Sequence, residues 1–348
     1  LALVVSRDGG VPLVHRSYPG NLPDVTQFAS VVDELVERYR AFTAEVEQLT
    51  VVYDAGNVSA ANQALVAETP LDYVCSLVTA HHKDLLAIPR SRFVPVEGFE
   101  GLSAYETEVE ALGATRRAVL THSDEFHRTQ ARSFAQTLAK CQRKLAELEQ
   151  VLARGKARRS RAQVEAEIAR ILKPRWASRV ITAELTGDRS KDLRLTFAVD
   201  QAALEALEAE HFGKRILTTS HADWPVEQVV AAYRSQAEVE ASFRQMKDPK
   251  VVSFSPMFHW TDQKIRLHVF YCVLALAIAQ LMRREAARAG MTMSVRELLR
   301  TLASIQETVL LYPSEGGRPR ARRMLTETEG TAKRLFDLFG LAEFAPAR

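Results

Sequence analysis

The first 80 residues alternate between short apolar runs and amphipathic stretches. Two runs of branched residues surround the turn Asp8-Gly9-Gly10, which is typical of a β-hairpin. Between residues 25 and 46 apolar residues recur at helical spacing, after the capping candidates Asp24 and Thr26. Strands that alternate with helices predict an α/β fold with a partly parallel sheet. The expected elements are strands at 1–7, 11–19, 48–54 and 71–79 and helices at 25–46 and 57–68.

The middle of the chain changes from loose to strongly helical. Residues 81–115 contain several Pro and Gly residues, and we expect only an edge strand there, near 90–97. From Ser123 to Leu172 the sequence is charged and helical, with a break near Gly155, which predicts a helical hairpin. Such a hairpin could be a spacer, a dimerisation arm or a DNA clamp. Its apolar stripe consists of Leu138, Leu145, Leu148 and Leu152.

The last third begins with alternating strand patterns and becomes helical. A helix at 225–247 is expected because its interior lacks Gly and Pro. The next helix contains an apolar run of about 14 residues, which is short of the roughly 20 that span a bilayer, so we expect a core helix. The remaining expected elements are strands at 179–187, 193–200 and 214–220, helices at 201–212, 261–288 and 294–308, a basic linker at 316–323 and a terminal helix to 341.

Composition narrows the class of protein. The chain of 348 residues is long enough for two or three domains. Its net charge of +3 is nearly balanced, so any nucleic-acid surface has to come from local clusters. The cysteines, Cys75, Cys141 and Cys272, are far apart and lack metal-ligand spacing, which indicates buried thiols in a reducing cytoplasm. The first residues show no secretory signal.

One face of the helix at 225–247 carries the most specific pattern in the chain. Tyr233, Glu240 and Lys247 lie at heptad spacing, within about 40° of one another. Glu238 points roughly 160° away from Glu240, toward solvent. A carboxylate on the packed side of a helix needs a partner or a metal, because burying it alone costs several kcal/mol. A Glu240–Lys247 ion pair at the edge of the core and a metal site both satisfy this requirement.

This stretch resembles the signature of the DDE transposases of bacterial insertion sequences, which is Tyr, two residues, Arg, three residues, Glu, six residues, Lys. Tyr233, Glu240 and Lys247 match that spacing, whereas Gln236 stands where the signature has Arg. The resemblance continues through residues 247–276, with the sequence His-Trp-Thr-Asp at 259–262 followed by a long apolar helix.

A second acidic residue extends the resemblance. Asp54 follows the apolar run Leu49–Tyr53, at the strand end where open α/β sheets bind ligands. On sequence alone it could equally cap the following turn. It resembles the second aspartate of the same family, and residues 17–24 resemble the stretch between the first and second aspartates.

The family resemblance implies phosphoryl transfer on DNA by two metal ions, Mg²⁺ or Mn²⁺. It assigns one metal each to Asp54 and Glu240, and it places the bridging first aspartate upstream of Leu1. Asp8, in a hairpin turn, is a poor substitute. We therefore expect an N-terminally truncated chain that is inactive as given. The residues expected to contact DNA are Tyr233, Gln236, Arg244, Lys247, His259, Arg266 and His268.

Weaker candidates have simpler interpretations. His81 and His82 suit an exposed loop, and Trp224 and Trp260 suit a core. The basic clusters suit solvated loops, or phosphate contacts if the protein acts on DNA. They comprise Arg154, Lys156, Arg158, Arg159 and Arg161, and Arg318, Arg320, Arg322 and Arg323.

The resulting hypothesis is a cytoplasmic insertion-sequence transposase. Its fold is expected to be an RNase H-like α/β core, a mixed sheet flanked by helices, interrupted by a helical hairpin plus β insertion and followed by an all-helical C-terminal region. Its partner is double-stranded DNA, on whose paired ends we expect a homodimer; we expect no membrane partner. The alternatives are a degenerate DNA-binding remnant and an RNase H-like nuclease. The expected parts are core 1–115, hairpin 116–175, β segment 176–220, catalytic helix and apolar helix 221–290, and C-terminal helices 291–348.

Overall fold

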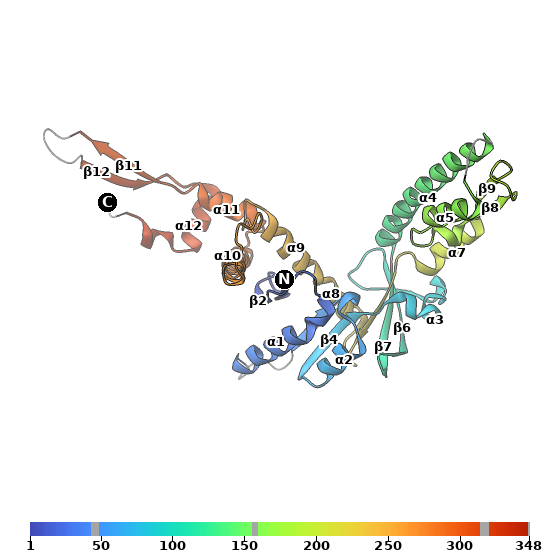
Figure 1. Ribbon diagram of the computed structural model, residues 1–348. Helices are drawn as coiled ribbons and strands as arrows, with labels where there is room; N and C mark the ends of the chain where they lie inside the picture. The colour runs from blue at the N-terminus through green and yellow to red at the C-terminus, as the bar shows by residue number, and fades with distance from the viewer. Residues whose placement is uncertain (43–48, 155–158, 314–319, 347–348) are drawn as a thin grey trace. The chain divides into compact units, whose positions relative to one another are not determined.

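A computed structural model describes residues 1–42, 49–154, 159–313 and 320–346 (Figure 1). It confirms a mixed α/β protein with a six-stranded sheet and flanking helices. The chain forms two compact units. Unit 1 consists of Leu1–Val52, Ala61–Leu71 and Arg234–Arg348, and unit 2 of Tyr53–Ala60 and Asp72–Tyr233.

The largest sheet has the strand order β3-β4-β10-β7-β6-β5. From β4 to β5, each strand pairs antiparallel with the next. Helix α2 (Ala60–Ala67) connects β3 to β4 in the chain, as expected. The strands are β3 (Leu49–Tyr53), β4 (Leu71–Ser76), β5 (Val94–Pro95), β6 (Leu102–Ala111), β7 (Ala114–Ser123) and β10 (Lys214–Thr219).

The long hairpin of β6 and β7 corrects the sequence analysis, which expected only an edge strand in this region. Leu112 and Gly113 turn the chain, both with positive φ. The side chains of Leu102, Val109 and Leu120 are buried, and they pack in the core of the sheet around Leu86 and Ile216 or beside it. The short helix α3 (Lys83–Leu86) contributes Leu85 and Leu86 to that core.

The insertion in unit 2 has one core of its own. The expected helical hairpin is confirmed, but it begins at Asp124 with Ser123 as N-cap, not at residue 116, which lies in β7. All four leucines of the expected stripe are buried. The expected strand pair is confirmed as a separate antiparallel sheet packed into the same core. The elements are α4 (Asp124–Ala153), α5 (Arg161–Ile171), α6 (Ala177–Val180), β8 (Ile181–Thr186), β9 (Arg194–Val199) and α7 (Gln201–His211).

Unit 1 is built around the long helix α10 (Asp262–Arg288). The expected first hairpin is confirmed as β1 (Ala2–Val5) and β2 (Pro12–Arg16), with a register shift between Val4 and Val5. Leu3 of this hairpin packs with Met246 and Leu276 in the core. Helix α1 (Phe28–Phe42) and helix α9 (Gln236–Lys247) complete this part of the unit.

The C-terminal region is not all-helical, which corrects the sequence analysis. Between α11 (Val295–Ala303) and α12 (Gly330–Leu338) lies an antiparallel hairpin of β11 (Glu307–Tyr312) and β12 (Arg320–Leu325). Residues 316–319 of the expected basic linker lie outside the described residues. Short 3-10 helices occur at Asp24–Thr26, Ala55–Asn57, Thr79–His81, Arg90–Arg92 and Leu341–Phe344.

Candidate functional site

The expected single helix at 225–247 is two helices. Helix α8 (Val226–Arg234) ends before Ser235, and α9 begins at Gln236. The carbonyl of Ser235 accepts a hydrogen bond from the backbone N–H of Glu238 at 2.9 Å. Because the break falls between Tyr233 and Glu240, these two residues do not share one continuous helical face. Tyr233 belongs to unit 2 and Glu240 to unit 1.

Tyr233 is a buried residue of unit 2. Its hydroxyl accepts a hydrogen bond from Nη1 of Arg215 at 3.2 Å. The Arg215 guanidinium also lies over the ring of Phe126, 4.5 Å from its centroid. The hydroxyl expected to contact phosphate therefore has a partner within the protein.

The two glutamates of α9 have the opposite placement to the one expected. Glu240 is exposed, while Ser242 and Met246 form the buried side of the helix. Glu238 is half-buried, with Oε2 3.5 Å from Nη2 of Arg283. The prediction that Glu240 lies on the packed side and Glu238 in solvent was therefore wrong. None of the ion pairs found among the described residues joins Glu240 to Lys247.

Glu240 shares α9 with further predicted DNA contacts. Arg244 and Lys247 are exposed, and Gln236 is half-buried. Both cations lie in the last turn of α9, where positive charge is favourable beside the helix C-terminus. An acidic residue and two cations are thus accessible on one short helix.

Asp54 lies where the sequence analysis expected it, directly after β3. It is exposed, its backbone carbonyl accepts from the N–H of Asn57 at 3.1 Å, and its Oδ1 accepts from Nδ2 of Asn57 at 3.0 Å. The side chain makes no hydrogen bond to the backbone N–H groups of the 3-10 turn. The turn interpretation and the strand-end placement are thus both correct, and one carboxylate oxygen faces no capping donor.

The donor chemistry of these two acids suits a divalent cation. Exposed carboxylate oxygens are the hard ligands that Mg²⁺ and Mn²⁺ prefer. Asp54 belongs to unit 2 and Glu240 to unit 1, so each is described within its own unit. Across the described residues, no group of three or more His, Cys, Asp and Glu side chains is arranged to hold a metal ion.

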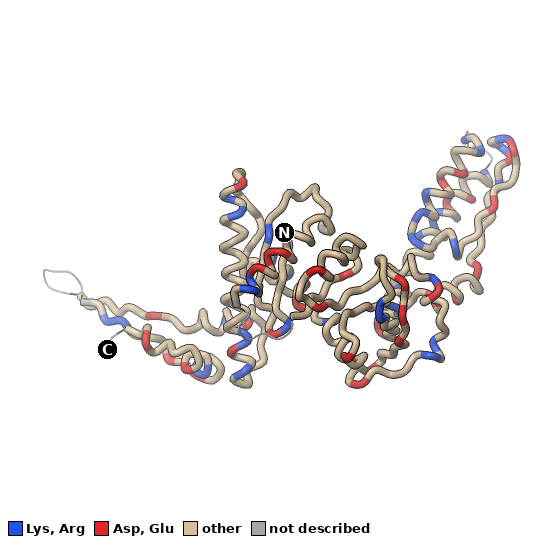
Figure 2. Tube along the Cα trace, turned by 90° about the horizontal axis from the view of Figure 1, so that it is seen from below, with Lys and Arg blue, Asp and Glu red and all other residues tan. Residues whose placement is uncertain are grey.

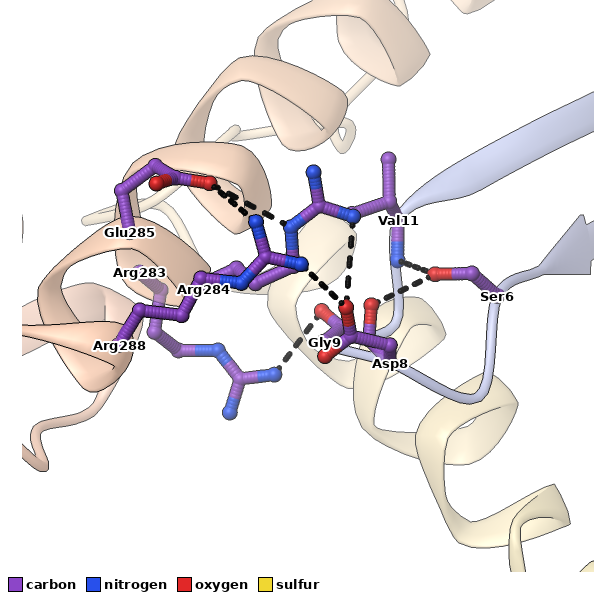
Figure 3. Close-up of polar contacts among 8 residues, drawn as sticks. All are labelled: Ser6, Asp8, Gly9, Val11, Arg283, Arg284, Glu285 and Arg288. Atoms are coloured by element: carbon purple, nitrogen blue, oxygen red, sulfur yellow. Dashed lines mark hydrogen bonds and ion pairs between the residues drawn. The ribbon is translucent and has the colours of Figure 1, made fainter.

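Asp8 is held by cations and not by other acids. Its Oδ2 lies 3.0 Å from Nη2 of Arg288 and 3.6 Å from Nη1 of Arg284 (Figure 3). Arg283 donates to the carbonyl of Gly9 at 3.0 Å, which fixes the same turn to α10. Two guanidinium groups compete with any metal for this carboxylate, which agrees with its exclusion as a substitute ligand.

The segment before α10 exposes aromatic side chains. Trp260 is 94% exposed, which corrects its assignment to the core, and Phe258 is 77% exposed. His259 and Arg266 are also exposed. His268 is half-buried, with Nε2 3.1 Å from the carbonyl of Phe254. This segment therefore presents aromatic and cationic groups to solvent, whereas the His268 ring faces the protein.

Sequence analysis missed a group of polar side chains in unit 2. His122, at the end of β7, is buried, and its ring centroid lies 5.5 Å from that of His127. Burial above all, with Arg90 and His127 nearby, lowers the pKa of His122 to about 4. Beside it lies an open cleft of about 740 Å³, lined by Arg90, Glu100, Gly101, Asp124, Glu125, His127 and Arg128. The only sequence signal was the spacing His122-x-Asp124-x2-His127.

Charge is distributed without a dominant sign. Lys and Arg are interspersed with Asp and Glu along both units (Figure 2). His81 is exposed, as expected, and His82 is half-buried. Comparisons with protein-family models, curated proteins and solved structures found no match to this chain.

Proposed function

We propose that this chain is the catalytic region of a DDE transposase of a bacterial insertion sequence, which cleaves and joins double-stranded DNA. The proposal takes the sheet with β3, α2 and β4 as an RNase H-like core and α4 to α7 as an insertion before the catalytic helix. The observation that carries it is Asp54, an exposed carboxylate directly after a sheet strand, where the resemblance requires the second acid. A cytoplasmic location and a homodimer on paired DNA ends belong to the same proposal.

In this function Asp54 and Glu240 hold divalent ions. The bound ions, Mg²⁺ or Mn²⁺, would supply activation of water or of a DNA 3′-hydroxyl and stabilisation of the leaving oxygen. Arg244 and Lys247 neutralise phosphate charge close to Glu240, and exposed Arg266 and His259 extend that cationic surface. The half-buried positions of Gln236 and His268 support a weaker contribution to DNA affinity from these two residues.

Iron-directed cleavage of the polypeptide tests whether the two acids share a metal site. The purified chain is loaded with Fe²⁺ and treated with ascorbate and peroxide, and the fragments are mapped by mass spectrometry. We expect cuts near residue 54 and near residue 240 in the same sample, both suppressed by excess Mg²⁺. Asp54→Asn and Glu240→Gln should each remove both cuts, because each variant lacks one carboxylate donor.

The matched controls are Asp84→Asn in unit 2 and Glu297→Gln in unit 1, which also remove exposed carboxylates. These controls should leave the cuts unchanged. Cuts at only one of the two positions, or cuts that persist in both variants, would refute the shared site and with it the proposed catalytic function.

A degenerate DNA-binding remnant is the second candidate. It is favoured by Gln236 in place of the family's Arg and by the pairing of the Tyr233 hydroxyl with Arg215. Binding of a labelled 30-base-pair duplex, followed by anisotropy at increasing salt, separates the two candidates from a protein without DNA affinity. A remnant should bind DNA with a salt-dependent affinity that Lys247→Ala weakens, and should show no paired iron cuts.

A further inference from the structure

Helix α10 presents apolar side chains on two opposite sides. One side packs into the core of unit 1 through Val269, Cys272, Val273 and Leu276. The other side is open to solvent, although it is equally apolar. Its large side chains are Leu267, Tyr271, Leu274, Ile278 and Leu281, exposed by 50%, 60%, 42%, 51% and 39%.

The spacing of these five exposed residues, called here the outer stripe, is that of a coiled-coil seam. Successive members are four, three, four and three residues apart, the alternation of a and d positions in heptads. Phe270, 46% exposed, borders the stripe and lies beside His15 of β2, with ring centroids 6.3 Å apart. A contiguous apolar surface of this kind is uncommon on a monomer and marks an interaction site.

We infer that the outer stripe is covered by the same stripe of a second copy of this chain, with the two α10 helices antiparallel about a two-fold axis near Leu274. A seam with heptad spacing is complementary to another helix of the same spacing. An isologous contact of this kind closes on itself as a dimer. The inference concerns the protein without DNA and does not depend on the proposed function.

Charge at the two ends of the outer stripe selects the antiparallel arrangement. The seam continues to Lys264, three residues before Leu267, and to Glu285, four residues after Leu281. In an antiparallel pair Lys264 of one copy lies opposite Glu285 of the other, whereas a parallel pair would bring like charges together. Within its own chain Glu285 already pairs with Arg288 at 3.1 Å, so Lys264 of the second copy would add a further cation to this carboxylate.

A lipid bilayer is the competing occupant. By length and composition α10 could cross a membrane, with a mean hydropathy of 1.8. Its inner side, however, is filled by the core of unit 1, and Arg283 near its end binds the carbonyl of Gly9 and faces Glu238. A spanning helix would have to give up these contacts. Heptad spacing restricted to one side also has no purpose in a lipid environment, which is uniform around the helix.

Cysteine cross-linking tests the register. Leu267→Cys and Leu281→Cys variants are oxidised alone and as an equimolar mixture, in nucleic-acid-free protein. The antiparallel arrangement predicts cross-linked dimers mainly in the mixture, because residue 267 faces residue 281 of the other copy. Ala287→Cys, exposed on the same helix outside the outer stripe, is the control, and the native thiols are buried.

Light scattering after size exclusion tests the dimer itself. The unmodified chain should elute as a dimer at micromolar concentration, and Leu274→Glu should weaken dimerisation at least about 100-fold, because two carboxylates would meet at the axis. Val151→Glu, which changes an exposed apolar residue of α4, should stay dimeric. Circular dichroism of each variant establishes that it is folded.

Three results would overturn the inference. They are a monomer at tens of micromolar, a Leu274→Glu variant that remains dimeric, and self-cross-linking of Leu267→Cys and Leu281→Cys alone with none in the mixture. Flotation of a monomeric chain with phosphatidylcholine and phosphatidylglycerol vesicles, abolished by Leu274→Glu, would assign the outer stripe to lipid instead.

Discussion

His122 is the residue whose surroundings depart furthest from those of a solvated side chain of its type. Gly213 makes its burial feasible, because a Cβ at this position would lie 2.8 Å from Nε2 of His122. Gly213 has a φ of +76°, which also favours glycine. Nδ1 of His122 has no hydrogen-bond partner and lies 3.6 Å from Oδ1 of Asp124. At neutral pH the ring is therefore uncharged in the folded protein.

This burial predicts acid sensitivity in unit 2. The pKa of His122 falls from its ordinary value of 6.5 to about 4 on folding, so between these pH values the unfolded chain binds a proton that the folded chain does not. The free energy of unfolding should therefore fall as pH is lowered from about 6.5 to about 4. Between pH 7.5 and pH 5 the loss due to His122 should be about 2 kcal/mol.

Urea unfolding followed by tryptophan fluorescence checks this, because Trp176 and Trp224 both lie in unit 2. The difference in unfolding free energy between pH 7.5 and pH 5 should shrink in His122→Asn relative to the unmodified chain. The control is His81→Asn, which changes an exposed histidine of the same unit. An unchanged pH dependence in His122→Asn would contradict the argument.

At this scale, sequence reasoning located Asp54 but not the orientation of Glu240. A strand followed by an acid and a Gly-Asn turn is a local pattern, so the position of Asp54 could be predicted. Which side of α9 packs depends on Leu3 and Gly10, more than 220 residues earlier in the chain, and on Arg283. Glu238 and Glu240 differ by only two positions, so local periodicity alone did not decide between them.

At the scale of elements, long amphipathic helices and branched strands were predictable, and tertiary pairing was not. The β6 strand alternates buried and exposed residues, but its outward Glu residues and the neighbouring glycines suggested a loop. In β12, Arg322 and Arg323 give no strand signal; they are extended because β11 pairs with them residue by residue. The break at Ser235 lacks Gly or Pro, so no local signal marked it.

The insertion offers a test of how much one helix position contributes. Leu145 of α4 is fully buried in the core formed with β8, β9 and α7, so Leu145→Ala should lower the free energy of unfolding of unit 2 by about 2–5 kcal/mol. Val151→Ala, on the same helix at 40% exposure, should cost less than about 1 kcal/mol. Urea unfolding of both variants measures the difference, and equal losses would mean that the α4 stripe is not the anchor of the insertion.

At the scale of the whole molecule, the hydrophobic cores of the described residues divide with the two units. The cores around Leu145 and Leu120 belong to unit 2, and those around Leu276 and Leu298 to unit 1. Cores without common members should respond separately to cavities, because the lost contacts are local.

Hydrogen exchange measured by mass spectrometry makes that separation visible. Leu276→Ala should speed amide exchange in α9, α10 and β1 and leave β7 and β10 close to the unmodified rate. Leu145→Ala should do the reverse, with faster exchange in α4 to α7. A rise spread evenly over the chain after either substitution would show that the two units unfold as one.

The clamp of Arg283 and Arg288 on the Asp8-Gly9 turn has a consequence for biosynthesis. The bond from Arg283 to the carbonyl of Gly9 joins residues 274 positions apart, and that from Arg288 to Asp8 joins residues 280 apart. At about 5–20 residues per second, a ribosome needs roughly 15 s to 1 min to deliver these arginines after the first hairpin emerges. The whole of unit 2 is translated in that interval. The earliest hairpin therefore waits for its partners while the later-encoded sheet folds, and a nascent chain stalled before α10 should expose Leu3 and Val14 to chaperones.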